Sequence, residues 1–155
     1  MQLNSTISDA KKKLEHYCAY QERCHDEVIQ KLRNMALDSN EIDEVIVHLI
    51  ENNFLNEERF ACCFARGKFR IKNWGKIRII NELKSRNISQ YNVNQALKEI
   101  EENDYITTFN SLSETTWANI TEKNKLKKRK KFCDYLLRKG FESNLVYEKV
   151  KELET

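Results

Sequence analysis

The sequence predicts an all-α fold, and three observations point to that class. Apolar residues recur at intervals of three and four residues almost throughout, which is the spacing of one face of an amphipathic helix. Nowhere do apolar and polar residues alternate over a stretch long enough to predict a strand. Residues that commonly cap helices stand at the starts of the apolar patterns. We therefore expect about nine short helices.

The length and composition agree with small packed units. The chain has 155 residues, no proline and three glycines, which fits one compact domain or a few small modules. It combines 40% apolar with 33% charged residues and a mean hydropathy of −0.74, so it can form a core while exposing a large charged surface. Collagen-like, linker-like and transmembrane classes are excluded on this composition.

Several positions along the chain carry helix start signals. Each is a short polar side chain that can accept a hydrogen bond from the free amides of a first helical turn. The capping candidates are Asp38 or Ser39, Asn56, Asn73, Ser89, Thr121 and Ser143. In this interpretation Trp74 opens a helix directly after Asn73, where an aromatic side chain could staple the helix entry.

An internal repeat relates three parts of the chain. Six apolar positions recur after 51 residues and again after a further 53 residues. Because a repeated helical unit buries the same positions in each copy, all of them are expected to face the core. The three series are Ile29, Leu32, Leu37, Ile42, Ile46 and Leu49; then Ile80, Leu83, Ile88, Val93, Leu97 and Ile100; then Cys133, Leu136, Phe141, Val146, Val150 and Leu153.

A hydrophobic residue marks the turn between the last two helices of each copy. These residues are Leu37, Ile88 and Phe141. Asn87 and Gly140, which tolerate the left-handed backbone conformation found at helix C-termini, directly precede two of them. Ala36 is the weaker equivalent in the first copy.

A further helix precedes each repeated pair, so each copy comprises three helices. These leading helices are expected roughly over residues 8–22, 57–71 and 105–119. The sequence therefore predicts three tandem three-helix modules, over residues 1–55, 56–103 and 104–155.

Charge is arranged in alternating blocks, although the net charge is only +3. Residues 66–86 hold eight basic side chains and one acidic, and residues 123–139 hold nine basic and one acidic. Residues 26–58 hold nine acidic and two basic side chains, and residues 99–122 hold six acidic and no basic ones. A dipolar body of this kind suits a partner that offers both protein and phosphate surfaces.

The basic blocks supply the candidate binding residues. Between residues 66 and 78, basic side chains alternate with large apolar ones, which combines charge with rings able to stack on bases. At helical spacing, however, Phe69, Ile71 and Ile77 are expected to face the core. A lysine-rich helix surface is by itself typical of a solvated face. The candidates for contact with a partner protein or with DNA are Arg66, Lys68, Arg70, Lys72, Lys76, Arg78, Lys127, Lys128 and Arg129.

Nothing in the sequence predicts a catalytic or metal site. Cys18, Cys24 and His25 lie close together, but no second pair of ligands follows them. The five cysteines are an odd number, Cys62 adjoins Cys63, and no apolar signal segment precedes them, so we expect reduced thiols in the cytoplasm. Phosphate-binding loops, His-Glu metal helices and serine nucleophile motifs are absent. We expect neither an enzyme nor a cofactor.

One stretch of sequence carries a family pattern. The segments NFLNEERFACCFARGKF and NWGKIRIINELKSRNIS contain an aromatic-Leu link into Arg-Phe-Ala, a basic helix, Gly and basic residues before Ile, then Glu-Leu and a turn ending in Ile. With the later segment KKFCDYLLRKGFESNLV, this pattern resembles the RecX family. There are three departures: Asn56 replaces the usual Asp, Ala36 replaces the usual Gly, and residues 105–117 match only loosely.

The resemblance implies a cytoplasmic bacterial protein that binds filaments of the RecA recombinase on single-stranded DNA. It implies inhibition of the ATPase and strand-exchange activities of RecA, and hence a role in DNA repair, recombination and the SOS response. It also implies that the three modules form a curved, elongated body lying in the filament groove. We expect a monomer without a membrane segment.

Two other functions stay open on the sequence alone. A helix-turn-helix protein acting directly on DNA would need one exposed recognition helix rich in Arg, Asn and Gln, whereas the positive charge here is spread over two modules. A helical scaffold for some other protein would not need the basic block of residues 66–86.

Overall fold

The structure, a computed structural model, describes residues 2–155, so only Met1 of the expected first module lies outside it. The described residues form nine α-helices and no strand, which confirms the all-α class. The helices are α1 (Gln2–Tyr20), α2 (His25–Arg33), α3 (Ser39–Glu51), α4 (Glu57–Lys72), α5 (Lys76–Ser85), α6 (Gln90–Leu97), α7 (Glu102–Asn119), α8 (Lys125–Lys139) and α9 (Ser143–Glu154).

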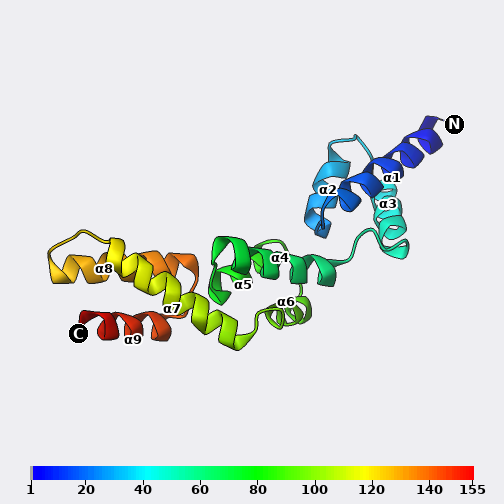
Figure 1. The fold of residues 1–155 in the computed structure, drawn as a ribbon. Coiled ribbons are helices and arrows are strands. Elements are labelled where there is room, and N and C mark those ends of the chain that lie inside the picture. The colour runs from blue at the N-terminus through cyan, green and yellow to red at the C-terminus, as the bar shows by residue number, and fades with distance from the viewer. Residues whose placement is uncertain (1) are drawn as a thin grey trace.

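The helices gather in three groups along an elongated molecule (Figure 1). Helices α1, α2 and α3 pack on one another at one end, α4 packs on α5 and α6 in the middle, and α7, α8 and α9 pack together at the other end. We call these groups the first, second and third modules. The two chain ends therefore lie at opposite ends of the molecule.

Three of the expected capping residues begin helices. Asp38 accepts a hydrogen bond from the Glu41 amide at 2.9 Å, and the Glu41 carboxylate accepts one from the Asp38 amide at 3.0 Å, which is a capping box. Asn56 accepts from the Arg59 amide at 2.9 Å, and Ser89 from the Asn92 amide at 3.2 Å.

The other three capping assignments are wrong. Asn73 ends α4 in a left-handed conformation, with φ at 55°, and α5 begins only after Gly75, so Trp74 lies in a link. Asparagine tolerates both roles, and the sequence alone did not separate them. Helix α8 is capped by Asn124 instead of Thr121, and Glu142 precedes α9, whose first residue is Ser143.

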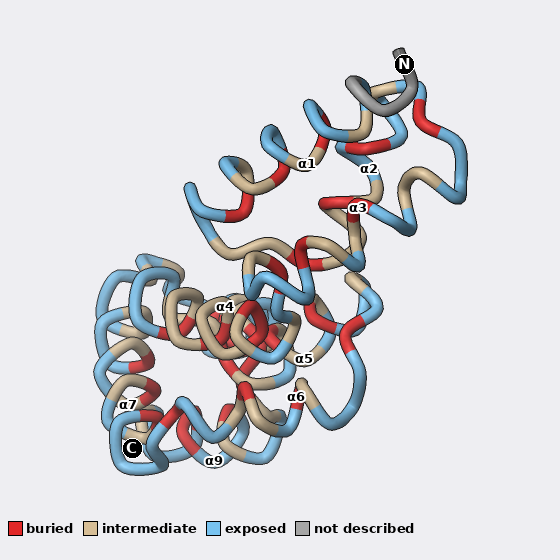
Figure 2. The backbone as a smooth tube through the Cα atoms, turned by 90° about the vertical axis from the view of Figure 1, so that its right-hand side faces the viewer, coloured by how far each residue is buried: buried red, intermediate tan, exposed pale blue. Residues whose placement is uncertain are grey.

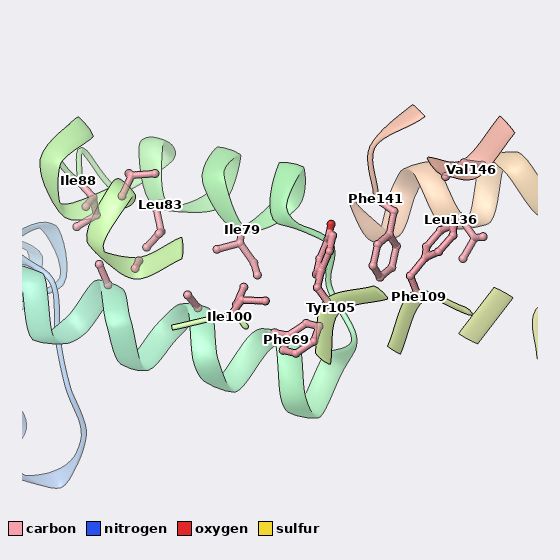
Figure 3. Close-up of a cluster of buried hydrophobic side chains, with 14 of the residues drawn as sticks. Phe69, Ile79, Leu83, Ile88, Ile100, Tyr105, Phe109, Leu136, Phe141 and Val146 are labelled. Carbon is pink, nitrogen blue, oxygen red and sulfur yellow. The ribbon is translucent and has the colours of Figure 1, made fainter. Parts of the chain in front are cut away.

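The apolar core divides into two clusters (Figure 2). One belongs to the first module and includes Leu14, Leu32 and Leu49, all fully buried. The other runs through the second and third modules, where the ring of Tyr105 lies between Phe69 and Phe141, with centroids 5.9 and 5.5 Å away (Figure 3). The second and third modules therefore share a core, and Cys24 is the one described residue of the first module that joins it.

The repeated turn is confirmed by the backbone. Ala36, Asn87 and Gly140 all have positive φ, at 58°, 60° and 101°. The hydrophobic residue after each of them is buried, and Ile88 and Phe141 donate amide hydrogen bonds to carbonyls five residues earlier, as helix-terminating turns require.

Three details of the expected core are wrong. Ile71 and Ile77 are 78% and 45% exposed, because α4 turns Ala61, Ala65 and Phe69 toward its neighbours and leaves Ile71 on the outer side. Phe69 is buried as expected. The first repeated position is displaced by one residue in two copies, where Val28 and Ile79 are fully buried and Ile29 and Ile80 only partly; in the third copy Cys133 is buried as expected, beside Phe132. Four other expected core positions are also only partly buried: Ile42, Ile46, Leu97 and Leu153.

Candidate functional site

The two basic blocks lie on different modules. The first covers α4, α5 and the link between them, and the second covers α8. Within the part of the chain that the structure describes, no group of three His, Cys, Asp or Glu side chains is placed to hold a metal ion. None of the described helices is long and apolar enough to cross a membrane. All nine candidate residues lie in these two basic blocks.

Three of the nine candidate cations form ion pairs with acids in other parts of the chain. Arg66 contacts Glu99 at 2.8 Å, and Lys76 contacts Glu102 at 3.1 Å. Arg129 pairs with Glu154 through two hydrogen bonds, which raises the pKa of this arginine. These side chains connect α4, α5 and α8 to following parts of the chain, so much of their charge is already matched.

The remaining six candidates make no ion pair in the described chain. They are Lys68, Arg70, Lys72, Arg78, Lys127 and Lys128. Lys128 lies over the Trp117 ring, 4.1 Å from its centroid. The candidates left with unmatched charge are thus concentrated on the second module.

Trp74 organises the cations of the second module. The Arg78 guanidinium lies 4.1 Å from the centroid of the indole, and the Lys68 ammonium lies 5.1 Å from it. Phe64 supports the indole edge-on, with centroids 6.1 Å apart. A guanidinium stacked on a ring keeps its in-plane N–H donors directed outward, which suits a carboxylate or phosphate. Trp74 therefore holds the Arg78 guanidinium by its face and leaves its edge available for hydrogen bonds.

The structure adds a cation that the sequence analysis omitted. Lys139, the last residue of α8, donates to the carbonyl of Lys72 at 2.5 Å. Burial lowers the pKa of Lys139, and the nearby charges of Arg78 and Lys72 lower it further. Arg78 also donates to the Arg138 carbonyl at 3.4 Å. We call Lys72, Arg78 and Lys139 the joint cluster.

The joint cluster lies where α8 ends against the start of α5. The amides of Gly75 and Ile77 donate to the carbonyls of Lys139 and Gly140 at 2.8 and 2.9 Å. Part of the cluster's charge offsets the negative C-terminal ends of α4 and α8. No ion pair of the described residues includes any of its three members, so the cluster remains positive.

None of the five cysteines belongs to the joint cluster, and three of them, Cys18, Cys24 and Cys133, are buried in the core. All five are free. Cys18 and Cys24 are buried in or beside the first module, and burial raises the pKa of the Cys18 thiol to about 11. A thiol with so high a pKa is a poor nucleophile and metal ligand at neutral pH. These residues contribute to packing.

The second module matches a known family model. Residues 56–97 match a model described as RecX, second three-helix domain. The Regulatory protein RecX of Lactococcus lactis is 32% identical over 146 residues, which cover 90% of this chain and 54% of that protein. The Regulatory protein RecX of Bacillus cytotoxicus is 24% identical over 150 residues, which cover 97% of this chain and 56% of that protein. The chain thus spans little more than half the length of these curated relatives.

Two solved structures have the same fold. The crystal structure of RecX from Lactobacillus salivarius aligns with a TM-score of 0.82 at 24% identity, over 97% of this chain and 98% of that chain. A crystal structure of a regulatory protein RecX also gives 0.82, at 18% identity, over 95% of this chain and 72% of that one. The fold is therefore shared along nearly the whole chain.

Proposed function

Because the chain belongs to the RecX family, we propose that it regulates the RecA recombinase. In this proposal it binds the RecA filament on single-stranded DNA in the bacterial cytoplasm, inhibits ATP hydrolysis and strand exchange, and so modulates DNA repair and recombination. The protein acts by binding, without a catalytic step or a cofactor of its own.

The joint cluster is the observation that carries this proposal furthest. It gathers three cations that make no ion pair among the described residues, one of them, Arg78, stacked on Trp74, midway along an elongated body. A nucleoprotein filament presents acidic side chains and phosphates, both of which a guanidinium binds through paired hydrogen bonds. We propose the surface around Lys72, Arg78 and Lys139, with Arg70 on the same helix as Lys72, as the filament-binding site.

The test is ATP hydrolysis by RecA on single-stranded DNA with the purified protein added. We expect hydrolysis to fall as the protein approaches stoichiometric amounts. Lys72→Glu with Arg78→Glu should weaken this inhibition strongly while helix content and melting stay close to those of the parent. The matched control is Lys98→Glu with Lys151→Glu, which makes the same charge change at exposed, unpaired lysines and should inhibit normally.

The outcomes separate the function from the site. If the parent protein leaves hydrolysis unchanged at stoichiometric excess, the proposed function is wrong. If the parent inhibits and the folded double variant inhibits equally well, the site is wrong. Direct binding to DNA without RecA, as in the helix-turn-helix alternative, would show a log-log salt slope of about −0.7 per phosphate contacted on single strands.

A further inference from the structure

The first module meets the second through polar groups. Cys24 is the one residue of the first module that joins the apolar cluster of the second and third modules among the described residues. The other buried apolar residues of the first module form a cluster of their own. Figure 2 shows the backbone of α1, α2 and α3 as a separate group. Little hydrophobic area therefore holds this joint closed.

Ion pairs and hydrogen bonds cross this contact. Arg59 on α4 donates to the Glu22 carboxylate at 2.6 Å and to the carbonyl of Asn53 at 3.1 Å. Arg86 lies 3.7 Å from the Glu27 carboxylate. Both acids, Glu22 and Glu27, belong to the first module, and both arginines belong to the second. These two pairs therefore bring opposite charges together across the joint.

The closed contact also leaves polar atoms unsatisfied. Glu22 Oε1 and Arg86 Nε are enclosed but make no hydrogen bond with the described protein. A polar atom that is enclosed without a hydrogen-bond partner is less stable than the same atom in water, which destabilises the closed joint. Opening the joint would expose both atoms to solvent and so offset part of the lost attraction.

The covalent connection at this joint is short. Leu55 is buried in the cluster of the first module, and the next residue, Asn56, caps α4 of the second module. Rotation about the backbone at this link would move α1, α2 and α3 together and, apart from the contact of Cys24, would leave both cores intact.

The joint between the second and third modules is of the opposite kind. Backbone amides of Gly75 and Ile77 bond directly to α8 carbonyls, and the Tyr105 ring lies in the shared core, where Figure 3 shows it beside Phe141. Neither feature depends on side-chain charge. Residues 56–155 therefore form one body.

We propose that the first module is an arm that swings on the Leu55–Asn56 link, and that the Arg59–Glu22 and Arg86–Glu27 pairs latch it closed. Salt opens the latch, since the screening length falls from about 10 Å at 0.1 M to about 3 Å at 1 M. The joint between the second and third modules keeps its geometry over the same range of salt.

Single-molecule energy transfer tests this proposal in the full chain. Dyes are attached through a ketone-bearing amino acid at exposed positions, which leaves the cysteines in place. One pair, at Val47 and Tyr91, reports the first joint, and a second pair, at Tyr91 and Tyr147, reports the second joint. Between about 0.05 M and about 1 M NaCl, the first pair should shift to a different and broader efficiency distribution while the second pair stays unchanged.

Removing the two arginine charges of the latch tests the proposal independently of salt. Arg59→Gln with Arg86→Gln should give the high-salt distribution already at low salt. Arg33→Gln with Lys98→Gln removes the same charge at exposed residues outside every ion pair described and should behave as the parent. If the first dye pair gives an efficiency distribution as narrow and as independent of salt as that of the second pair, the proposal is wrong. Measurements on the parent chain alone are enough to obtain this result.

Discussion

Gly75 lies against Gly140 with no room for a side chain at either position. The Gly75 amide donates to the Lys139 carbonyl at 2.8 Å, and a Cβ on Gly75 would lie 2.3 Å from the Gly140 carbonyl carbon. A Cβ on Gly140 would lie 2.3 Å from Cβ of Arg78. The start of α5 can therefore reach the end of α8, and form the joint cluster, only because both residues are glycine.

Gly75→Ala should separate these helix ends. The new methyl group would meet backbone, which cannot move aside as a flexible side chain does, so we expect a loss of at least about 1–3 kcal/mol in the free energy of unfolding. Gly67→Ala is the control, since its Cβ would meet nothing within 4 Å. Gly67 lies inside a helix, so the control should stabilise by about 0.5–1 kcal/mol. Denaturant titration measures both, and equal effects would contradict the close approach.

Tyr105→Phe should weaken the same joint without changing its ring packing. The Tyr105 hydroxyl accepts from the Lys76 amide at 2.9 Å and donates to Glu142. Phenylalanine keeps the ring between Phe69 and Phe141 but leaves these partners unmatched, which should cost about 1–3 kcal/mol. An unchanged midpoint in denaturant would show that water replaces the hydroxyl at no cost.

The variant should also alter the alkaline stability. Burial, and then the hydrogen bond to Glu142, raise the pKa of Tyr105 above that of an exposed tyrosine. Stability from a raised pKa is fully present below the unfolded pKa of about 10 and is lost as the pH rises toward the folded pKa. Unfolding followed from pH 8 upward should thus show a smaller alkaline loss in Tyr105→Phe.

Local features were predictable from sequence, and contacts between distant segments were not. The turns at Ala36, Asn87 and Gly140 follow from the chemistry of a few adjacent residues. Lys139 joins Lys72 and Arg78 across a contact between segments more than 60 residues apart. No periodic pattern in the sequence predicts a contact between segments so far apart. For the same reason, the sequence did not predict that Arg66, Lys76 and Arg129 form ion pairs with acids far along the chain.

Ala36→Gly should stabilise the first module. Ala36 has a φ of 58°, where a Cβ costs roughly 1–2 kcal/mol. Glycine removes this cost at the price of a more flexible unfolded chain, so we expect a net gain of about 0.5–1 kcal/mol. Ala96→Gly, in a buried right-handed helix, should instead lose about 1 kcal/mol or more. Thermal melting distinguishes the two signs, and destabilisation by Ala36→Gly would contradict the assigned backbone.

Leu83→Ala tests the repeated apolar register. Leu83 is fully buried at the position that Leu32 and Leu136 occupy in the other modules. Its truncation should cost about 2–5 kcal/mol through lost burial and the cavity left behind. Leu126→Ala, at a side chain that is 76% exposed, should change stability by no more than about 0.5 kcal/mol. A cost below about 1 kcal/mol at Leu83 would place it outside the core.

Lys149 occupies the position in α9 where the other modules bury Val45 and Ala96. Its ammonium lies 3.2 Å from Glu114 and 3.0 Å from Glu152. Burial alone would lower the pKa of Lys149, but hydrogen bonds to Glu152 and Glu114 outweigh it and raise the pKa. The charge is therefore held in place by acids that are themselves largely exposed.

Lys149→Met should leave the protein as stable as the parent or stabilise it by up to about 2 kcal/mol. Methionine fills the same space without the cost of burying a charge, and the exposed carboxylates of Glu114 and Glu152 return to water. Lys149→Glu should lose about 3–5 kcal/mol, because it buries an acid beside two others. Unfolding in urea at neutral pH measures both variants. A loss above about 2 kcal/mol in Lys149→Met would mean that the ion pairs, and not the buried stem of the side chain, stabilise the third module.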